Sequence, residues 1–209
     1  MKLYCFGESG NAYKVALALE LLNESWEPVH VDFFNGETRS PEFRKINVMG
    51  EVPVLVDGDV TVSQSGNILD YISTITGELG GTFAADRREV SRWILFDTQK
   101  LSGQAGPLRF MMNFLPEDKR DQAVIDWMTG RFRAALQILE AHLAGNDWIA
   151  SGKVTIADCA CAGYLFYEEP FAFDRGEWPN IDAWLDRLSA LPGWKPPYDL
   201  MQRAFPPAS

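Results

Sequence analysis

Three short stretches in the first third of the chain could bind a ligand. The first is "GESGNAYK", in which Ser9 and Asn11 stand between an apolar run and a helical pattern. The second is "EVPV", in which Pro53 interrupts a run with the composition of a strand. The third is "SQSGN", residues 63–67, which opens another helical pattern. The local fold alone could also explain each group.

The first group stands at the positive end of the expected helix. The first backbone N–H groups of a helix have no partner within it, so a helix N-terminus attracts anions. Ser9 and Asn11 could add side-chain contacts to such an anion. Alternatively, the polar residues simply cap the helix, as serine often does. The stretch by itself leaves both interpretations open.

The second group raises the question of how a proline enters a sheet. Proline lacks the N–H that a central strand needs. A cis bond between Val52 and Pro53 at the start of the strand would turn the backbone of Val52 outward. Its N–H and C=O could then pair with a bound peptide, as an added strand does. The alternative is an ordinary proline in an edge strand.

The third group begins a helix. We expect Ser65 to be the N-cap residue, which leaves unpaired N–H groups at an end that attracts carboxylates. The side-chain amide of Gln64 could donate to the same anion. Most serine N-caps only cap, so this signal is weak when taken alone.

The spacing of apolar residues predicts the elements that position these groups. Apolar residues recur at helical spacing from Val15 to Trp26, whereas residues 28–33 alternate as in a strand. The order predicted for the first part is a strand, a helix and a strand, then an irregular segment, a hairpin and a helix. The first two strands should be parallel with a right-handed crossover. The expected strands and hairpin are residues 2–6, 28–33 and 52–62, and the last helix begins at Ser65.

Strand patterns vanish after the glycine-rich segment 76–81. We expect an N-terminal domain over residues 1–76, a linker over 77–85 and an all-helical domain over 86–209. The stretches with helical patterns are residues 86–101, 117–145, 155–167 and 180–191.

Composition excludes several classes of function. The net charge is −10 over 209 residues, which disfavours nucleic acid or an anionic membrane as a partner. The longest apolar runs are far shorter than a membrane span, and the first residues lack a signal-peptide core. The three cysteines and two histidines have no spacing typical of a disulfide framework or a metal site. We therefore expect a cytoplasmic protein without a metal.

The order of the motifs resembles the glutathione S-transferase superfamily. After the serine-bearing turn come "MGEVPVL" (49–55), "SQSGNILDYI" (63–72) and "VTIADCACAG" (154–163). In the last, Thr155 would be an N-cap and Asp158 would complete a capping box. The resemblance covers nearly the whole chain and implies a thioredoxin-like α/β N-terminal domain followed by an all-α C-terminal domain. It also implies glutathione as co-substrate, a small hydrophobic electrophile, a homodimer and a role in detoxification.

The resemblance gives Ser9 and Asn11 the catalytic role of stabilising the glutathione sulfur as a thiolate. "S-G-N-A-x-K-V" is similar to a bacterial variant with threonine at the first position and asparagine two residues later. A thiol with a pKa near 8.5 is only about 3% thiolate at pH 7. A hydrogen bond to a charged group contributes roughly 1.5–3 kcal/mol, or about one to two pKa units. Cys5, inside the first strand, is not placed to act as the cysteine of cysteine-type members. Which of Ser9 and Asn11 contacts the sulfur stays open.

The same resemblance assigns the glutathione-binding residues. Gln64 and Ser65 would hold the γ-glutamyl carboxylate, Val52 would pair with the cysteinyl backbone, and Pro53 would expose Val52. Glu51 departs from the pattern, because many members carry a donor there for the glycine carboxylate. Either another residue supplies the cation or glutathione binds more weakly; the candidates are Arg39, Lys45 and Lys14.

The electrophile pocket is expected in the second part of the chain. "GPLRFMMNFLP" (106–116) and "AGYLFYEEPF" (162–171) are rich in aromatic residues and methionine, with Phe110, Met111 and Tyr164 as candidates. Packing between helices explains any one of these residues equally well. The expected activity is the addition of glutathione to an electrophile. The alternatives are another glutathione-dependent reaction (isomerisation, dehalogenation, ether cleavage or peroxide reduction) or a non-catalytic binding protein, which Glu51 favours.

Overall fold

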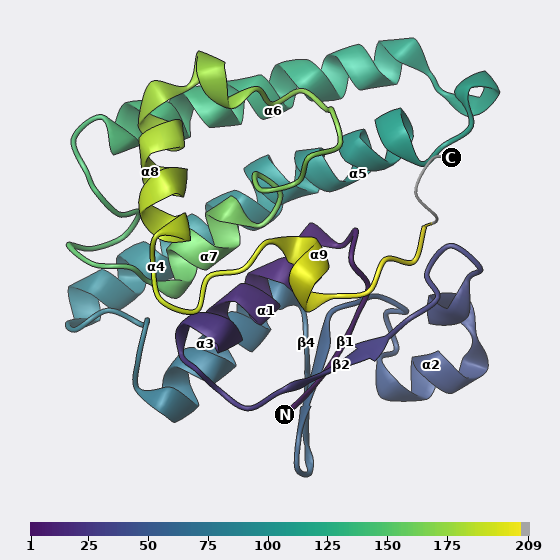
Figure 1. The fold of residues 1–209 in the computed structure, drawn as a ribbon, viewed down its shortest axis with the longest axis horizontal. Helices are drawn as coiled ribbons and strands as arrows, with labels where there is room; N and C mark the ends of the chain where they lie inside the picture. Colours follow the sequence, from purple (N-terminus) through teal and green to yellow (C-terminus); the bar gives the residue numbers. More distant parts are fainter. Residues whose placement is uncertain (206–209) are drawn as a thin grey trace.

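A four-stranded mixed sheet forms the base of the N-terminal part (Figure 1). The computed structural model describes residues 1–205. The strands lie in the order β2-β1-β3-β4, with β1 and β2 parallel and the other pairs antiparallel. The predicted parallel pair and hairpin are therefore confirmed. The strands are β1 (Lys2–Cys5), β2 (Glu27–His30), β3 (Val54–Asp57) and β4 (Val60–Ser63).

The second strand is shorter than the predicted range of 28–33. Val31 still donates its N–H to Cys5 (2.9 Å), but the N–H of Phe33 then bonds back to the carbonyl of Val31 (2.9 Å). This tight turn ends the strand, so the alternation beyond residue 30 does not continue the sheet.

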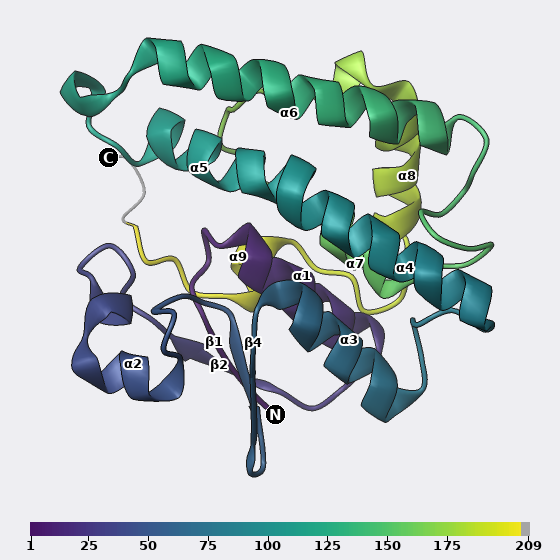
Figure 2. The same cartoon turned by 180° about the vertical axis from the view of Figure 1, so that it is seen from behind.

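Two helices, α1 (Gly10–Leu21) and α3 (Ser65–Thr76), pack side by side between the sheet and the helical part (Figure 2). α1 is buried nearly all round, from Ala12 through Leu19, because α7 covers the side turned away from the sheet. A helix covered on both sides must be apolar on both sides, which explains why its sequence has a weak single-face pattern. A short helix, α2 (Pro41–Ile46), flanks the sheet.

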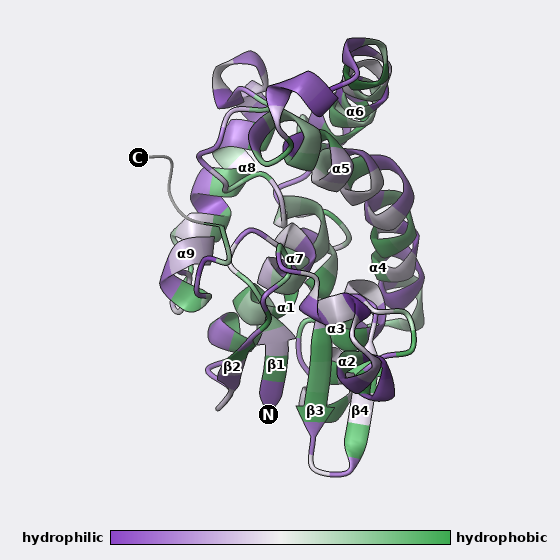
Figure 3. Cartoon of the chain, turned by 90° about the vertical axis from the view of Figure 1, so that its right-hand side faces the viewer, coloured by the Kyte–Doolittle hydropathy of each residue, from purple (hydrophilic) through white to green (hydrophobic). Residues whose placement is uncertain are grey.

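The rest of the described chain is helical and, over residues 84–205, contains no strand. Figure 3 shows this part stacked above α1 and α3. Its elements are α4 (Ala84–Phe96), the π-helical segment η2 (Asp97–Leu101), α5 (Ser102–Asn113), α6 (Gln122–Leu143), α7 (Ile156–Ala162), α8 (Pro179–Ser189) and α9 (Pro197–Leu200). Single 3₁₀ turns are η1 (Glu37–Arg39), η3 (Glu117–Lys119) and η4 (Arg175–Glu177).

The helix predictions hold in part. The patterns over 86–101, 117–145, 155–167 and 180–191 correspond to α4, α6, α7 and α8 with shifted ends. α5 was not among the predicted helices, because Gly103, Gly106 and Pro107 are poor helix formers. Residues 206–209 of the expected helical domain lie outside the described residues.

The start of α3 differs from the prediction. Ser65 is the first helical residue and not the N-cap; that position belongs to Gln64, whose φ is 69°. The left-handed backbone at Gln64 is unusual for a non-glycine residue and turns the chain from β4 into the helix. Within residues 1–205, no side chain caps this helix end, so the unpaired N–H groups expected there are present in the described structure. The peptide bond between Val52 and Pro53 is cis, as predicted.

The capping box at α7 is present as predicted. The side chain of Thr155 accepts from the N–H of Ala157 (3.3 Å), and Asp158 accepts from the N–H of Thr155 (2.8 Å). Asp158 also accepts from the N–H of Ile149 (2.9 Å) and from Nε1 of Trp184 (3.0 Å). This carboxylate therefore joins three segments of the helical part.

Candidate functional site

A cavity of about 530 Å³ lies between the N-terminal part and α5. Both polar and aromatic side chains line it. The cavity brings together seven of the residues singled out in the sequence, namely Ser9, Asn11, Glu51, Val52, Phe110, Met111 and Tyr164. Gln64 and Ser65 line an adjoining cavity of about 260 Å³ that shares Asn11 with the first. Pro53 is buried beneath and lines neither.

Ser9 is the N-cap of α1. Its Oγ accepts from the N–H of Ala12 (3.2 Å). The hydroxyl keeps its own hydrogen, and within residues 1–205 that hydrogen has no acceptor in the protein. Ser9 can therefore cap the helix and still donate to an atom in the cavity, so the two interpretations of this residue are compatible.

Asn11 is held in one orientation by a buried lysine. Nζ of Lys14 donates to Oδ1 of Asn11 (2.9 Å), and Oγ of Ser65 lies 3.4 Å from the same oxygen. An ammonium group can only donate, so the amide oxygen must face Lys14. The NH₂ group of Asn11 is thereby left as the donor of this side chain toward the cavity.

Lys14 is itself fixed by an ion pair with Asp97. The two side chains are almost completely buried, with 2.5 Å between Nζ and Oδ2. Oγ of Ser102 donates to the other oxygen of Asp97 (2.6 Å). Burial raises the pKa of the Asp97 carboxyl, while Lys14 and Ser102 oppose that rise. Because Lys14 is committed to this pair, it is not available to a carboxylate of a ligand.

Arg39 is the one of the three candidate cations that lies beside the cavity. It lines a pocket of about 300 Å³ with Thr38, and this pocket shares Phe33, Phe34, Gly50 and Phe110 with the main cavity. Lys45, the remaining candidate, is exposed and lines neither pocket. Of the three cations considered from the sequence, Arg39 is the one placed at the site.

Glu51 and Val52 form the edge of the cavity next to β3. Nε2 of Gln64 donates to Oε2 of Glu51 (3.0 Å), so the acidic side chain has a polar partner. Within residues 1–205, the backbone N–H and C=O of Val52 make no hydrogen bond. Both groups are available to the backbone of a ligand, as an outward-turned residue before a proline allows.

Tyr164 packs tightly against two glycines. A Cβ at Gly10 would lie 2.6 Å from its ring, and one at Gly106 would lie 2.9 Å from its hydroxyl. Both glycines therefore permit the ring to reach the wall of the cavity beside the start of α1. Burial raises the pKa of the Tyr164 hydroxyl to about 12, so this hydroxyl stays protonated at neutral pH and can donate a hydrogen bond.

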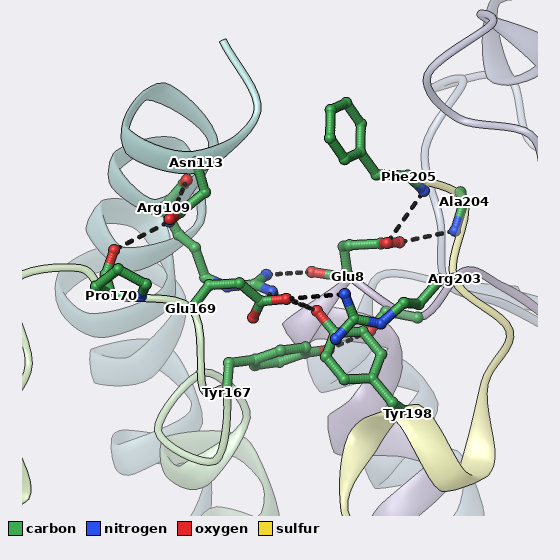
Figure 4. Close-up of polar contacts among 11 residues, drawn as sticks. Glu8, Arg109, Asn113, Tyr167, Glu169, Pro170, Tyr198, Arg203, Ala204 and Phe205 are labelled. Carbon is green, nitrogen blue, oxygen red and sulfur yellow. Dashed lines mark hydrogen bonds and ion pairs between the residues drawn. The ribbon is translucent and has the colours of Figure 1, made fainter. Parts of the chain in front are cut away.

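Arg109 is a residue of the site that the sequence interpretation missed. Its guanidinium is buried and donates to the carbonyl of Glu8 (2.6 Å), to Glu169 (2.7 Å) and to the hydroxyl of Tyr198 (2.9 Å) (Figure 4). It also lies 3.8 Å from the centre of the Tyr167 ring. The signal available was an arginine inside the apolar run "PLRFMM". The aromatic pair Phe33 and Phe34, which walls the cavity, was also missed.

Within residues 1–205, no three side chains of histidine, cysteine, aspartate or glutamate gather as metal ligands would. None of the helices in that range combines the length and apolarity needed to cross a membrane.

A mixed sheet with a cis-proline just before its inner strand β3, joined across a cavity to a helical part, defines a class of two-part proteins with an α/β part followed by an all-helical part. Residues 1–74 match the family described as "Glutathione S-transferase, N-terminal domain", and residues 106–192 match "Glutathione S-transferase, C-terminal domain". The chain belongs to the glutathione S-transferase superfamily. The resemblance and the fold class expected from the sequence, a thioredoxin-like domain followed by an all-α domain, are thus confirmed.

Relatives with known names or structures agree with this assignment. Glutathione S-transferase 3 of Zea mays is 29% identical, with 100% of this chain and 98% of the relative covered. A crystal structure of a possible glutathione S-transferase from Rhodopseudomonas palustris is 35% identical with a TM-score of 0.88, covering 99% of this chain and 93% of the other. A glutathione transferase from Burkholderia graminis, solved with two glutathione molecules bound per subunit, is 28% identical with a TM-score of 0.82, covering 92% and 84%.

Proposed function

We propose that this protein is a glutathione transferase that activates glutathione as a thiolate and adds it to small hydrophobic electrophiles. One observation carries the proposal: two side-chain donors, Ser9 and Asn11, lie at the N-terminus of α1 in a cavity that aromatic rings also line. Glutathione bound to the related Burkholderia graminis enzyme supports the identity of the thiol.

The chain would bind glutathione along the edge of the sheet. The N–H and C=O of Val52 would pair with the cysteinyl backbone, as a short added strand. Gln64 and Ser65 would receive the γ-glutamyl carboxylate at the start of α3, where unpaired N–H groups favour a negative charge. Arg39 would meet the glycine carboxylate in place of the donor that Glu51 does not provide.

The bound sulfur would lie between the hydroxyl of Ser9 and the NH₂ group of Asn11. Each hydrogen bond to a charged sulfur stabilises the thiolate by roughly 1.5–3 kcal/mol, which lowers the thiol pKa by about one to two units. The thiol proton leaves to solvent, so a general base is not required. The thiolate then attacks the electrophilic carbon and a carbon–sulfur bond forms as the leaving group departs with its electron pair.

The aromatic end of the cavity would hold the electrophile. Phe110, Met111 and Tyr164 would contact it together with Phe34 and Phe114. Aromatic rings and a methionine adapt to flat apolar molecules of different outline. Membership of the superfamily further supports a cytoplasmic homodimer with a role in detoxification. Each chain would consist of an N-terminal domain over residues 1–76, a linker over 77–85 and a helical domain from residue 86.

Two other functions remain candidates because of particular features. The residues around Ser9 bind the glutathione moiety, so the same site could serve isomerisation, dehalogenation, ether cleavage or peroxide reduction. Glu51 favours a non-catalytic binding protein, because its charge opposes a ligand carboxylate at that edge.

A binding and turnover experiment tests the proposal. Glutathione affinity is measured by calorimetry and conjugation by turnover of chlorodinitrobenzene, for wild type, Ser9→Ala and Ser40→Ala. Ser40 is the matched control, because it caps α2 in the same way but lies outside the cavity. The proposal expects turnover to fall about tenfold or more in Ser9→Ala and to be unchanged in Ser40→Ala.

Three results would count against the proposal. No binding at millimolar glutathione rejects the glutathione site. Binding without turnover of any electrophile favours the non-catalytic alternative. Equal loss in both serine variants means that Ser9 only caps its helix.

A further inference from the structure

The last part of the described chain returns to the loop that precedes Ser9. We call residues 197–205 the strap; they begin at α9 and run across this loop (Figures 1 and 4). The N–H of Gly7 donates to the carbonyl of Gln202 (2.7 Å). At its base, the strap is fixed by Tyr198, which bonds to both Arg109 and Glu169. The strap is thus bonded both to the loop that precedes Ser9 and to the helical part.

Glu8 is the residue that holds the end of the strap. It is only 4% exposed, and its two carboxylate oxygens accept from the N–H of Ala204 (3.0 Å) and of Phe205 (3.1 Å). Within residues 1–205, the carboxylate of Glu8 makes no ion pair. A buried carboxylate must be compensated by hydrogen bonds, and the strap supplies them.

These two bonds place the ring of Phe205 on the aromatic wall of the cavity. Its centre lies 4.9 Å from that of Phe34 and 5.3 Å from that of Phe114. Phe34 and Phe114 both line the cavity, and Phe34 is also nearly parallel to Phe110, at 6.4 Å and 9°. Phe205 therefore supports the rings that would receive an electrophile.

We propose that Phe205 is a specificity-determining residue for aromatic electrophiles and that Glu8 is the positioning residue that holds it. This inference rests on the proposed function. With the strap in place, the wall is rigid and matches a flat ring. When Phe205 is removed, the rings of Phe34 and Phe114 lose a neighbour and the wall opens toward solvent. Loss of one or two aromatic contacts corresponds to about a three- to tenfold weakening for an aromatic group.

Two glutathione conjugates that differ only in the group on sulfur test the proposal. S-(dinitrophenyl)glutathione reaches the aromatic wall, whereas S-methylglutathione does not. Their affinities are measured by calorimetry for wild type, Phe205→Ala, Phe205→Leu and Glu8→Gln. Asp199→Asn is the matched control, since Asp199 is an exposed carboxylate of the same strap with no side-chain hydrogen bond in the described structure.

The expected pattern is selective. Phe205→Ala and Glu8→Gln should each weaken binding of the dinitrophenyl conjugate about three- to tenfold and leave the affinity for S-methylglutathione unchanged. Phe205→Leu, which keeps an apolar side chain at the position, should weaken it less. The double variant Glu8→Gln with Phe205→Ala should lose no more affinity for the dinitrophenyl conjugate than Phe205→Ala alone, because Glu8 acts through Phe205. Asp199→Asn should match wild type.

The outcomes separate the two proposals. If wild type binds neither conjugate, the proposed function fails and the inference fails with it. If wild type binds both and Phe205→Ala weakens both equally or neither, the glutathione site stands and the role of Phe205 is rejected. If Glu8→Gln does not fold, the comparison of Phe205→Ala with Phe205→Leu still decides.

Discussion

Nζ of Lys14 lies 2.9 Å from Oδ1 of Asn11, and this contact fixes which end of the asparagine amide faces the cavity. The lysine reaches that oxygen from within a buried pair with Asp97, a residue 83 positions further along the chain. The donor proposed for the glutathione sulfur thus depends on an ion pair between the two parts of the protein.

The first prediction concerns that ion pair. Lys14→Met alone would leave Asp97 buried and unpaired, at a cost of roughly 3–5 kcal/mol, so both charges are removed together in Lys14→Met with Asp97→Leu. The freed amide of Asn11 can then turn, and the pKa of bound glutathione should rise by about one unit. Adding the pair of changes to Asn11→Ala should cause no further rise. An additive rise would mean that Lys14 acts on the sulfur without Asn11.

The second prediction concerns the glycine carboxylate. Arg39→Ala should weaken glutathione binding by about tenfold or more. This is the effect of losing one charge-assisted hydrogen bond of roughly 1.5–3 kcal/mol. Glu51→Lys should tighten binding, because it replaces a repelling charge with an attracting one. Calorimetry with glutathione and with its glycine ethyl ester tests both changes, since the ester lacks the charge. Lys45→Ala is the control. If Arg39→Ala weakened binding of glutathione and of its ester equally, Arg39 would not contact the glycine carboxylate.

The third prediction concerns the helical part. Asp158→Ala removes the acceptor of Ile149, Thr155 and Trp184 and leaves buried donors unpaired. We expect a loss of roughly 3–5 kcal/mol in the free energy of unfolding, compared with about 1 kcal/mol for Thr155→Ala, which removes the cap on Ala157 and one of the hydrogen bonds that Asp158 accepts. Urea unfolding measures both. Similar small losses in the two variants would show that Asp158 is no more than a helix cap.

The fourth prediction concerns the base of the strap and pH. Burial opposes ionisation of Glu169, but hydrogen bonds from Tyr198 and Arg109 outweigh it and lower the pKa of this carboxyl below its ordinary 4.5. The carboxylate therefore stabilises the folded state fully above the ordinary pKa, and this contribution is lost as pH falls through the lower folded value.

The unfolding free energies of wild type and Glu169→Gln, compared across pH, test this linkage. The difference between them should be constant near neutral pH and should shrink below about pH 4.5. A difference that does not vary with pH would mean that the charge of Glu169 contributes nothing to stability.

Features encoded in neighbouring residues could be predicted from the sequence. The short apolar run of β1, the hairpin at Asp57-Gly58 and the Thr155–Asp158 capping box each depend on residues within a few positions of one another. The low helix propensity of Gly103, Gly106 and Pro107 explains why α5 was not predicted. In the structure α5 packs against α6 and α1. At Gln64, the left-handed backbone carries no sequence signal, because glutamine rarely adopts it.

Contacts between distant residues could not be predicted. Lys14 with Asp97 and Glu8 with the strap join residues that are 83 and 196 positions apart. Neither pair follows a period or a motif, since only the folded chain brings them together. Ser9 and Asn11 were singled out because Val52-Pro53 and Gln64-Ser65 follow them in the order of the family's motifs. Among the three candidate cations, only position in space distinguishes Arg39.

The pKa of glutathione bound to the protein tests the central claim most directly. It is read from the ultraviolet absorbance of the thiolate as pH is varied. The protein's own cysteines should not interfere, because burial raises the pKa of the Cys5 thiol to about 12 and also raises the pKa values of Cys159 and Cys161. We predict a pKa for bound glutathione at least one unit below the ordinary thiol value of about 8.5, and a return toward that value in Ser9→Ala combined with Asn11→Ala. A bound thiol that titrates at its ordinary pKa in wild type, or a lowered pKa that survives in the double variant, would contradict the account.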